Sequence, residues 1–397
     1  MNASKSPRDF VSKHIAELPK SGIRAFFDLV TQMDDVISLG VGEPDFTTPW
    51  TIRESGIYSI ERGRTSYTSN LGMPALRKEI CKYVSRNYGI DYDSTCQCIV
   101  TVGVSEAVDL VIRAVTEPGD EIIYSEPCYV SYPAEIKMSH GIPVPVTTRK
   151  ENLFALAPKD VEKAVTAKTK AILINFPCNP TGAVMDEKQL REIADIAIKH
   201  DLLVLTDEIY SELTYDGRHT SIASLPGMKE RTVFLHGFSK AFAMTGWRIG
   251  YACGPKEIID AMMKIHQYSI MCAPTMAQAA ALEALQRGGN EMAKMRESYR
   301  ARRDFFVRKL NEAGLPCHLP NGAFYAFCEV GHTGLSEEEF AERLLKEQHV
   351  AIVPGTAFGP GGKGFCRCSY ATGMNELAEA AKRIKAFVDS LHRKGEK

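Results

Sequence analysis

Polar and charged side chains follow several apolar runs in the middle of this chain, and their types could do chemistry together. They are Asn179, Asp207, Tyr210, Ser239, Lys240 and Arg248. Each has an ordinary explanation when taken alone: an asparagine before Pro-Thr-Gly is typical of a turn, and a lysine after Phe-Ser is typical of a solvated loop. Together they supply an amide, a carboxylate, a phenol, a hydroxyl, an amine and a guanidinium.

This combination suits a phosphorylated pyridine aldehyde. A lysine amine forms a Schiff base with the aldehyde, and a carboxylate pairs with the ring nitrogen. A phenol and an amide bind the ring oxygen. An arginine and a helix N-terminus hold the phosphate, because free backbone amides and the helix dipole favour an anion. We therefore expect the six residues to converge on one crevice.

Strands alternating with helices must position these residues. Apolar runs typical of strands lie at 98–103, 121–127, 142–148, 171–177, 202–210, 232–239 and 248–254. Helical patterns intervene, as at 105–115 and 186–200, where apolar residues recur at i, i+3 and i+4. This alternation predicts βαβ units and a mostly parallel α/β sheet covered on both faces. Ligands of such sheets bind beyond the carboxyl ends of the strands, where the six residues lie.

The pattern changes beyond about residue 285. A long charged helix at 287–313 is followed by the run GAFYAFCEV, a helix from Ser336, the runs VAIVPG and FCRCSYA, and a final helix. This order predicts a smaller α+β domain at 286–397. We expect residues 1–45 to join it, and residues 46–285 to form the large domain.

Length and composition are those of an ordinary globular protein. The chain has 397 residues, of which 44% are hydrophobic and 24% charged, and these values exclude a disordered or fibrous protein. A formal net charge of −1 gives no support for a nucleic-acid partner. No charge-free run reaches the roughly 20 apolar residues of a membrane span. We expect a cytoplasmic protein that contacts no membrane and no nucleic acid.

Two features could indicate a different site. The eleven cysteines include no pair of C-x2-C motifs, and His236 and Cys253 show no metal-ligand spacing, so we expect packing roles and no metal. The string at 359–364 matches G-x-G-x-x-G, but it precedes a strand-like run and no helix. We therefore interpret it as a glycine loop of the small domain and not as a dinucleotide-binding turn.

Several separated motifs resemble those of the class I and II aminotransferases, which are pyridoxal-phosphate enzymes of fold type I. The motifs are SLGVGEPDFTTP, YTSNLGMPALR, VTVGVSEA, NPTGAV, LTDEIY, GFSKAFAMTGWRIGY, and VAIVPGTAFG with RCSYA. They span nearly the whole chain and are most similar to the prokaryotic aspartate, aromatic and N-acetyl-diaminopimelate subgroup. The resemblance implies a large domain with a mostly parallel seven-stranded sheet and a smaller α+β domain.

The resemblance also implies a role for each matching residue. Lys240 matches the lysine that binds pyridoxal 5'-phosphate covalently, Asp207 matches the partner of the ring nitrogen, and Tyr210 and Asn179 match the donors to the ring oxygen. Tyr129 matches the aromatic residue stacked on the ring. The expected phosphate ligands are Val104, Ser105, Ser239, Arg248 and Tyr67.

Substrate binding and assembly follow from the same resemblance. Arg367 matches the bidentate anchor of the substrate α-carboxylate, and Gly40 matches a backbone contact near it. Asn179 and Tyr129 are expected to contact the substrate as well. Tyr67 matches a tyrosine that reaches the phosphate of the neighbouring subunit, which implies a homodimer.

The activity implied is amino transfer from an L-amino acid to a 2-oxo acid such as 2-oxoglutarate, by a ping-pong mechanism with Lys240, Asp207 and Tyr210 as catalytic residues. Three departures leave the donor open among aspartate, aromatic and N-acetyl-diaminopimelate-like amino acids. Gly237 replaces a serine of some aspartate enzymes, Ser105 replaces a lysine of others, and the stacking residue is tyrosine and not tryptophan. Arg24 is either a contact for a distal acid group or a surface arginine.

Three alternatives to an aminotransferase are considered. A C–S β-lyase shares the cofactor, the fold and the lysine, and release of pyruvate and sulfide would identify it. A non-catalytic regulator of the same fold is disfavoured because every catalytic group is present. A nucleotide-dependent dehydrogenase is disfavoured by the position of the glycine string.

Overall fold

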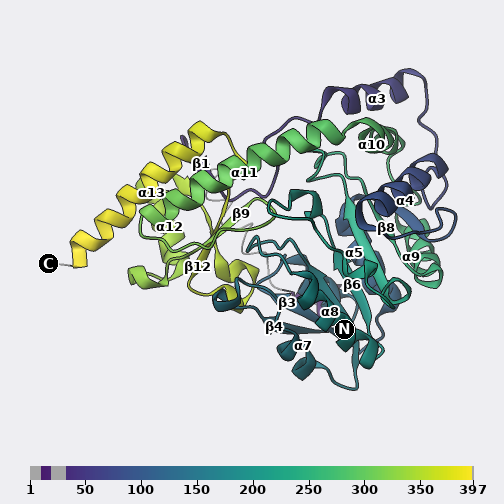
Figure 1. Cartoon of the computed structure of the whole chain (residues 1–397), viewed down its shortest axis with the longest axis horizontal. Coiled ribbons are helices and arrows are strands. Elements are labelled where there is room, and N and C mark those ends of the chain that lie inside the picture. Colours follow the sequence, from purple (N-terminus) through teal and green to yellow (C-terminus); the bar gives the residue numbers. More distant parts are fainter. Residues whose placement is uncertain (1–9, 19–32, 396–397) are drawn as a thin grey trace, which may run out of the picture.

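A seven-stranded sheet is the centre of the computed structural model, which describes residues 10–18 and 33–395, without the side chains of 392–395 (Figure 1). The strands are β2 (Cys98–Thr101), β3 (Glu121–Glu126), β4 (Ile142–Thr147), β5 (Thr169–Asn175), β6 (Leu203–Asp207), β7 (Thr232–Gly237) and β8 (Gly250–Cys253). Their order is β2-β8-β7-β6-β5-β3-β4. Only β8 runs antiparallel to its neighbours. All seven predicted runs therefore form strands, and the predicted mostly parallel sheet is confirmed.

Helices cover the sheet and its edges. They are α3 (Trp50–Glu61), α4 (Pro74–Tyr88), α5 (Gly103–Val115), α6 (Ser131–Met138), α7 (Pro158–Ala164), α8 (Glu187–Lys199), α9 (Lys256–Ser269) and α10 (Thr275–Arg287). Helix α5 packs against α6, α9, β7 and β8, whereas α7 packs against α8 and α10 packs against α3 and α4.

The central strands are largely apolar because both faces of the sheet are buried there. In β5, Leu173 packs into one core together with α5, and its neighbours Ile172 and Ile174 pack into another core together with α8. This alternation follows from the two-residue period of a strand. Helix α8 begins after Asp186, whose carboxylate accepts the backbone N–H of Gln189 in a capping box.

The C-terminal third forms a second group of elements, on the left of Figure 1. They are α11 (Gly289–Glu312), β9 (Tyr325–Glu329), α12 (Glu337–Gln348), β10 (Val350–Ala351), β11 (Val353–Pro354), β12 (Phe365–Ser369) and α13 (Met374–Gly395). Strands β11, β12 and β9 form an antiparallel three-stranded sheet in that order. The glycine string at 359–364 lies directly before β12, which is the context expected for a loop.

The segment before α3 adds a short strand, β1 (Ile37–Ser38), which pairs in parallel with β10. Strand β1 is thus hydrogen-bonded to the C-terminal group, while the domain boundaries at 45 and 285 stay a prediction.

The remaining elements are α1 (Lys13–Ala16) and the short 3₁₀ helices η2 (Lys150–Asn152), η3 (Ser211–Leu213), η4 (Ile222–Ser224), η5 (Lys229–Arg231), η6 (Gly331–Thr333), η7 (Gly355–Phe358) and η8 (Pro360–Gly362). Within the part of the chain that is described, no helix has the length and apolar character needed to cross a membrane.

Candidate active site

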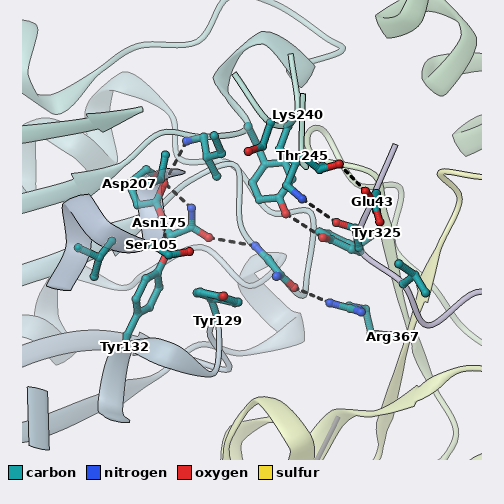
Figure 2. Close-up of a pocket in the computed structure, with 18 of the residues that line it drawn as sticks. Glu43, Ser105, Tyr129, Tyr132, Asn175, Asp207, Lys240, Thr245, Tyr325 and Arg367 are labelled. Atoms are coloured by element: carbon teal, nitrogen blue, oxygen red, sulfur yellow. Dashed lines mark hydrogen bonds between the residues drawn. The ribbon is translucent and has the colours of Figure 1, made fainter. Parts of the chain in front are cut away.

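A cavity of about 530 Å³ lies where the carboxyl ends of the central strands face the C-terminal group. Every predicted site residue except Tyr67 lines it, and Figure 2 shows ten of the lining side chains by name. Strand ends, the N-terminus of α5, the segment after β1 and strand β12 all contribute. The predicted convergence of the six strand-end residues is therefore observed.

Asp207 is the last residue of β6 and lies deep in the cavity. One carboxylate oxygen accepts the hydroxyl of Tyr132 at 2.7 Å, and the other accepts the backbone N–H of Ile209 at 3.1 Å. Asn175 ends the neighbouring strand β5 in register with Asp207, and its amide donates to the Asp207 carbonyl at 2.8 Å. Burial raises the pKa of Asp207, whereas the two hydrogen bonds to its carboxylate favour the ionised form.

Lys240 follows β7 and directs its amine into the same cavity. The Nζ atom donates a hydrogen bond to the carbonyl oxygen of Gly42 at 2.6 Å. Desolvation of the amine lowers the pKa of Lys240 to about 8, and the positive charges of Arg367 and Arg248 act in the same direction, against the opposing charge of Glu43. A large fraction of the amine is thus neutral near pH 8, as a nucleophile or a general base requires.

Arg367 belongs to β12 and approaches from the opposite side. Its Nη1 donates to Oδ1 of Asn179 at 2.9 Å, and its Nη2 donates to the carbonyl oxygen of Gly40 at 2.5 Å. The guanidinium carbon lies 4.5 Å from the ring centre of Tyr325 and 4.7 Å from that of Phe358. Burial lowers the pKa of Arg367. The buried Nε has no hydrogen-bond partner within the described chain, so this guanidinium can still bind an anion.

Close backbone approach places the N-terminus of α5 beside Arg248. Gly103 has a φ of +71°, and a Cβ added there would lie 2.6 Å from the Arg248 guanidinium. A Cβ on Gly250 would lie 2.6 Å from the carbonyl carbon of Gly103 and 2.7 Å from the nitrogen of Val104. Glycine at both positions therefore lets the first turn of α5, with Val104 and Ser105, line the cavity next to a guanidinium.

One predicted cofactor contact lies outside this arrangement. Tyr67 is 81% exposed and does not line the cavity of its own chain, as expected of a residue that reaches another subunit. Arg24 lies outside the described residues. Tyr129 lines the cavity and packs edge-on against Tyr132, with ring centres 5.6 Å apart.

Several lining residues were missed by the sequence analysis. Tyr325 hydrogen-bonds through its hydroxyl to that of Tyr210 at 2.7 Å, across a separation of 115 residues. Asn175 could have been found, because it ends an apolar run like the predicted residues. Tyr132, Tyr325 and Glu135 carry no such local signal, since their positions depend on packing between distant elements.

Glu135 is a buried carboxyl group on α6 that lines the cavity. The residue is 7% exposed, and its Oε2 has no hydrogen-bond partner among the residues described. Burial, followed by the negative charges of Asp109 and Asp207, raises the pKa of Glu135 to about 9. The carboxyl group is therefore neutral at pH 7.

Replacing Glu135 with glutamine is expected to stabilise the cofactor-free protein by roughly 2–4 kcal/mol more at pH 8 than at pH 5. The folded state holds the proton up to about pH 9, whereas the ordinary pKa is 4.5. The stabilising contribution of this proton is thus complete below pH 4.5 and is lost as the pH rises toward 9. Glutamine does not titrate. Guanidinium unfolding at both pH values measures the difference, with Glu54→Gln on the exposed face of α3 as the control. Parallel pH dependences for wild type and Glu135→Gln would contradict the prediction.

Comparison with known proteins gives consistent results. The family model described as "Aminotransferase class I and II" matches residues 34–384. The Bacillus subtilis protein YugH, named only as an aminotransferase, is 55% identical over 96% of this chain and 98% of its own. The aspartate aminotransferase of Pyrococcus abyssi is 45% identical over 92% of this chain and 95% of its own. The crystal structure of an aromatic aminotransferase from Pyrococcus horikoshii superimposes with a TM-score of 0.88 at 43% identity, covering 92% of this chain and 99% of that one.

Proposed function

The chain belongs to the class I and II aminotransferases, and from this premise we propose that it uses pyridoxal 5'-phosphate to transfer an amino group from an L-amino acid to a 2-oxo acid such as 2-oxoglutarate. We further propose a ping-pong mechanism in a cytoplasmic homodimer. The observation that carries the proposal is that the amine of Lys240, the carboxylate of Asp207 and the guanidinium of Arg367 line a single cavity.

The cavity residues fit the proposed cofactor. A volume of about 530 Å³ lies within the range of small-molecule sites, roughly 300–1,000 Å³. The glycine-lined approach of α5 to Arg248 places backbone amides and a guanidinium together, which is the donor set for a phosphate. At the other end, Asp207 offers a buried carboxylate to a ring nitrogen, and Tyr210 and Asn179 offer a phenol and an amide to a ring oxygen.

We assign the cofactor contacts on this basis. Lys240 binds the aldehyde carbon, Tyr129 covers the ring face, and Tyr210 and Asn179 bind the ring oxygen. Val104, Ser105, Ser239 and Arg248 bind the phosphate, together with Tyr67 of the partner subunit. The bound cofactor supplies an electron-accepting ring that weakens the α-C–H bond of the amino acid.

The residues of the chain supply the remaining steps. Arg367 holds the substrate α-carboxylate, with Gly40 and Asn179 beside it. Once the substrate amine has taken the place of Lys240 on the aldehyde carbon, the freed Nζ of Lys240 would take the α-proton and pass it on, and its lowered pKa suits this exchange near neutral pH. Asp207 keeps a proton on the ring nitrogen. The side-chain preference is left open among aspartate, aromatic and N-acetyl-diaminopimelate-like donors.

A half-reaction screen tests the proposed function. Purified protein with bound cofactor is mixed with single amino acids, and a shift of the visible absorption band, with release of the matching 2-oxo acid, identifies the donor. Adding 2-oxoglutarate should reverse the shift. Stoichiometric release of pyruvate, ammonia and sulfide from cysteine, or of pyruvate, ammonia and homocysteine from cystathionine, without amino transfer would instead identify the β-lyase.

Replacing Arg367 with alanine is expected to lower kcat/KM by about 10²–10³-fold, mainly through a higher KM, because truncating one member of a buried charge pair costs about 2–5 kcal/mol. The visible absorption of bound cofactor should remain. Steady-state kinetics and the absorption spectrum measure the two effects. Arg367→Lys keeps the charge without the planar fork and should lie between wild type and Arg367→Ala. An unchanged KM in Arg367→Ala would contradict the assignment.

A further inference from the structure

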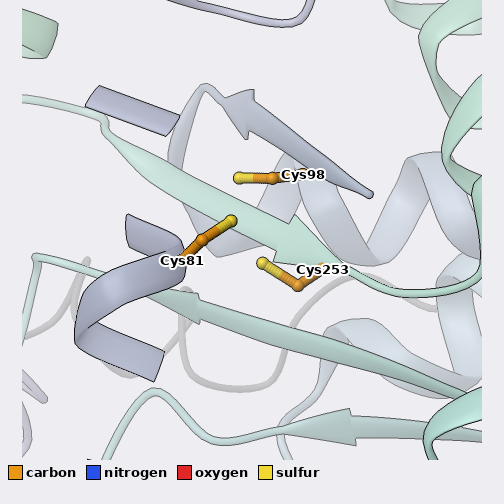
Figure 3. A group of neighbouring side chains, drawn as sticks. All are labelled: Cys81, Cys98 and Cys253. Atoms are coloured by element: carbon orange, nitrogen blue, oxygen red, sulfur yellow. The ribbon is translucent and has the colours of Figure 1, made fainter. Parts of the chain in front are cut away.

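Three cysteine side chains from distant parts of the sequence meet at the β2 edge of the large sheet. Cys81 lies on α4, Cys98 begins β2, and Cys253 ends β8. Their sulfur atoms all lie within 4.8 Å of one another, and Figure 3 shows the three side chains converging between the helix and the strands. Cys98 and Cys253 are register partners across the antiparallel β2–β8 pair, and Cys81 approaches from the helix.

We propose that Cys81, Cys98 and Cys253 form a site for one soft divalent d¹⁰ cation held by three sulfur ligands, the class that includes Cd(II) and Hg(II). Thiolates select soft metal ions. At the zinc–sulfur distance of about 2.3 Å, three sulfurs in a trigonal plane lie roughly 4 Å apart, and a larger ion spreads them further, toward the 4.8 Å within which all three sulfurs lie. Structural zinc sites take four ligands, and among the described residues no fourth His, Cys, Asp or Glu joins this group.

The charge around the cluster also suits this class of ion. Arg77 lies one helical turn before Cys81 and is 8% exposed. A divalent ion would displace the thiol protons of the three cysteines to solvent, with no oxidation of sulfur. Three thiolates and a divalent ion carry one net negative charge, which one guanidinium offsets.

The simplest rival is packing, because free cysteine behaves as a small hydrophobic residue. All three residues belong to an apolar core that also contains Val84, Val100 and Tyr251. A second rival is a Cys98–Cys253 disulfide, which the structure does not contain. Both rivals leave the protein without a tight site for a soft ion, so metal binding separates them from the proposal.

The test titrates the reduced, chelator-treated holoenzyme with Cd(II) against a competing chelator. We expect one tightly bound Cd(II) per chain, an ultraviolet thiolate-to-metal absorption band and a higher midpoint of thermal unfolding. Cys81→Ala and Cys253→Ala should each weaken Cd(II) binding by more than about 100-fold, since changes even outside a ligand set cost roughly 10–100-fold. Cys272→Ala and Cys317→Ala, at partly exposed thiols outside the cluster, should bind Cd(II) like wild type.

Three results would overturn the proposal. One is wild-type protein that binds no tight Cd(II) and unfolds at the same temperature with and without it. Another is Cys253→Ala or Cys81→Ala binding Cd(II) with wild-type affinity. The third is a Cys98–Cys253 disulfide recovered by mass spectrometry from the protein as isolated. Cd(II) binding and the midpoint of thermal unfolding are both measured on the wild-type protein. The test therefore stays decisive even if a cysteine variant fails to fold.

Discussion

Replacing Lys240 with alanine is expected to lower transamination by at least about 10⁴-fold, because one side chain supplies both the covalent attachment and the proton transfer. The variant should also lose the visible absorption of covalently bound cofactor. The physical reason is that desolvation lowers the pKa of the Lys240 amine to about 8, so that part of it is neutral. The methyl group of alanine can neither attack the aldehyde nor carry a proton. Single-turnover kinetics and absorption spectra after incubation with pyridoxal phosphate measure both effects.

Two further variants separate chemistry from folding. Lys240→Arg keeps a cation beside Gly42 but not a nucleophilic amine, so it should be as inactive as Lys240→Ala. Lys256→Ala, at an exposed position on α9, should retain wild-type activity. Transamination by Lys240→Ala at a near wild-type rate would end the assignment of this residue.

The second large effect is expected for Asp207→Asn, which should lower kcat by about 10²–10³-fold while cofactor stays attached to Lys240. The carboxylate charge holds a proton on the ring nitrogen, and a neutral amide of the same size cannot do so. Removing one buried electrostatic contact to a developing charge costs about 10²–10³ in rate in other enzymes. Comparing kcat with the amount of bound cofactor measures the effect on chemistry alone.

Tyr132→Phe is the matched control for Asp207→Asn. It removes the 2.7 Å hydrogen bond from the phenol but keeps the carboxylate. A hydrogen bond to a charged group is worth about 1.5–3 kcal/mol, and this deletion leaves the carboxylate charge in place, so the variant should lose less activity than Asp207→Asn. Equal losses in the two variants would show that the hydrogen-bonded geometry matters and the charge does not.

Much of the site could be predicted because chain connectivity itself brings strand ends together. Once 171–177, 202–210 and 232–239 are read as parallel strands, Asn179, Asp207 and Lys240 must lie at the same edge of the sheet. Long apolar runs made these strands easy to recognise, since both faces of the sheet are buried. The same reasoning predicted a loop for the glycine string at 359–364, which contains no α-helix and only the short 3₁₀ helix η8.

Contacts between distant elements could not be predicted in this way. Tyr325 reaches Tyr210 from the second sheet, and the neutral state of Glu135 depends on burial that no local pattern reveals. The cysteine cluster has no spacing motif, because its members come from a helix and two strands that only the fold brings together. Exposed Tyr67 needs a second copy of the chain, so its role stays a prediction.

The short stretch after β1 has a consequence for how the cavity opens to a ligand. The carbonyl oxygens of Gly40 and Gly42 accept hydrogen bonds from Arg367 and Lys240, so one peptide stretch occupies both cations. An incoming carboxylate must compete with the Gly40 carbonyl oxygen for the guanidinium of Arg367. In the cofactor-free protein, a shift of the stretch would release the amine of Lys240 and the guanidinium of Arg367 in one event, so the two groups would become available together and not independently.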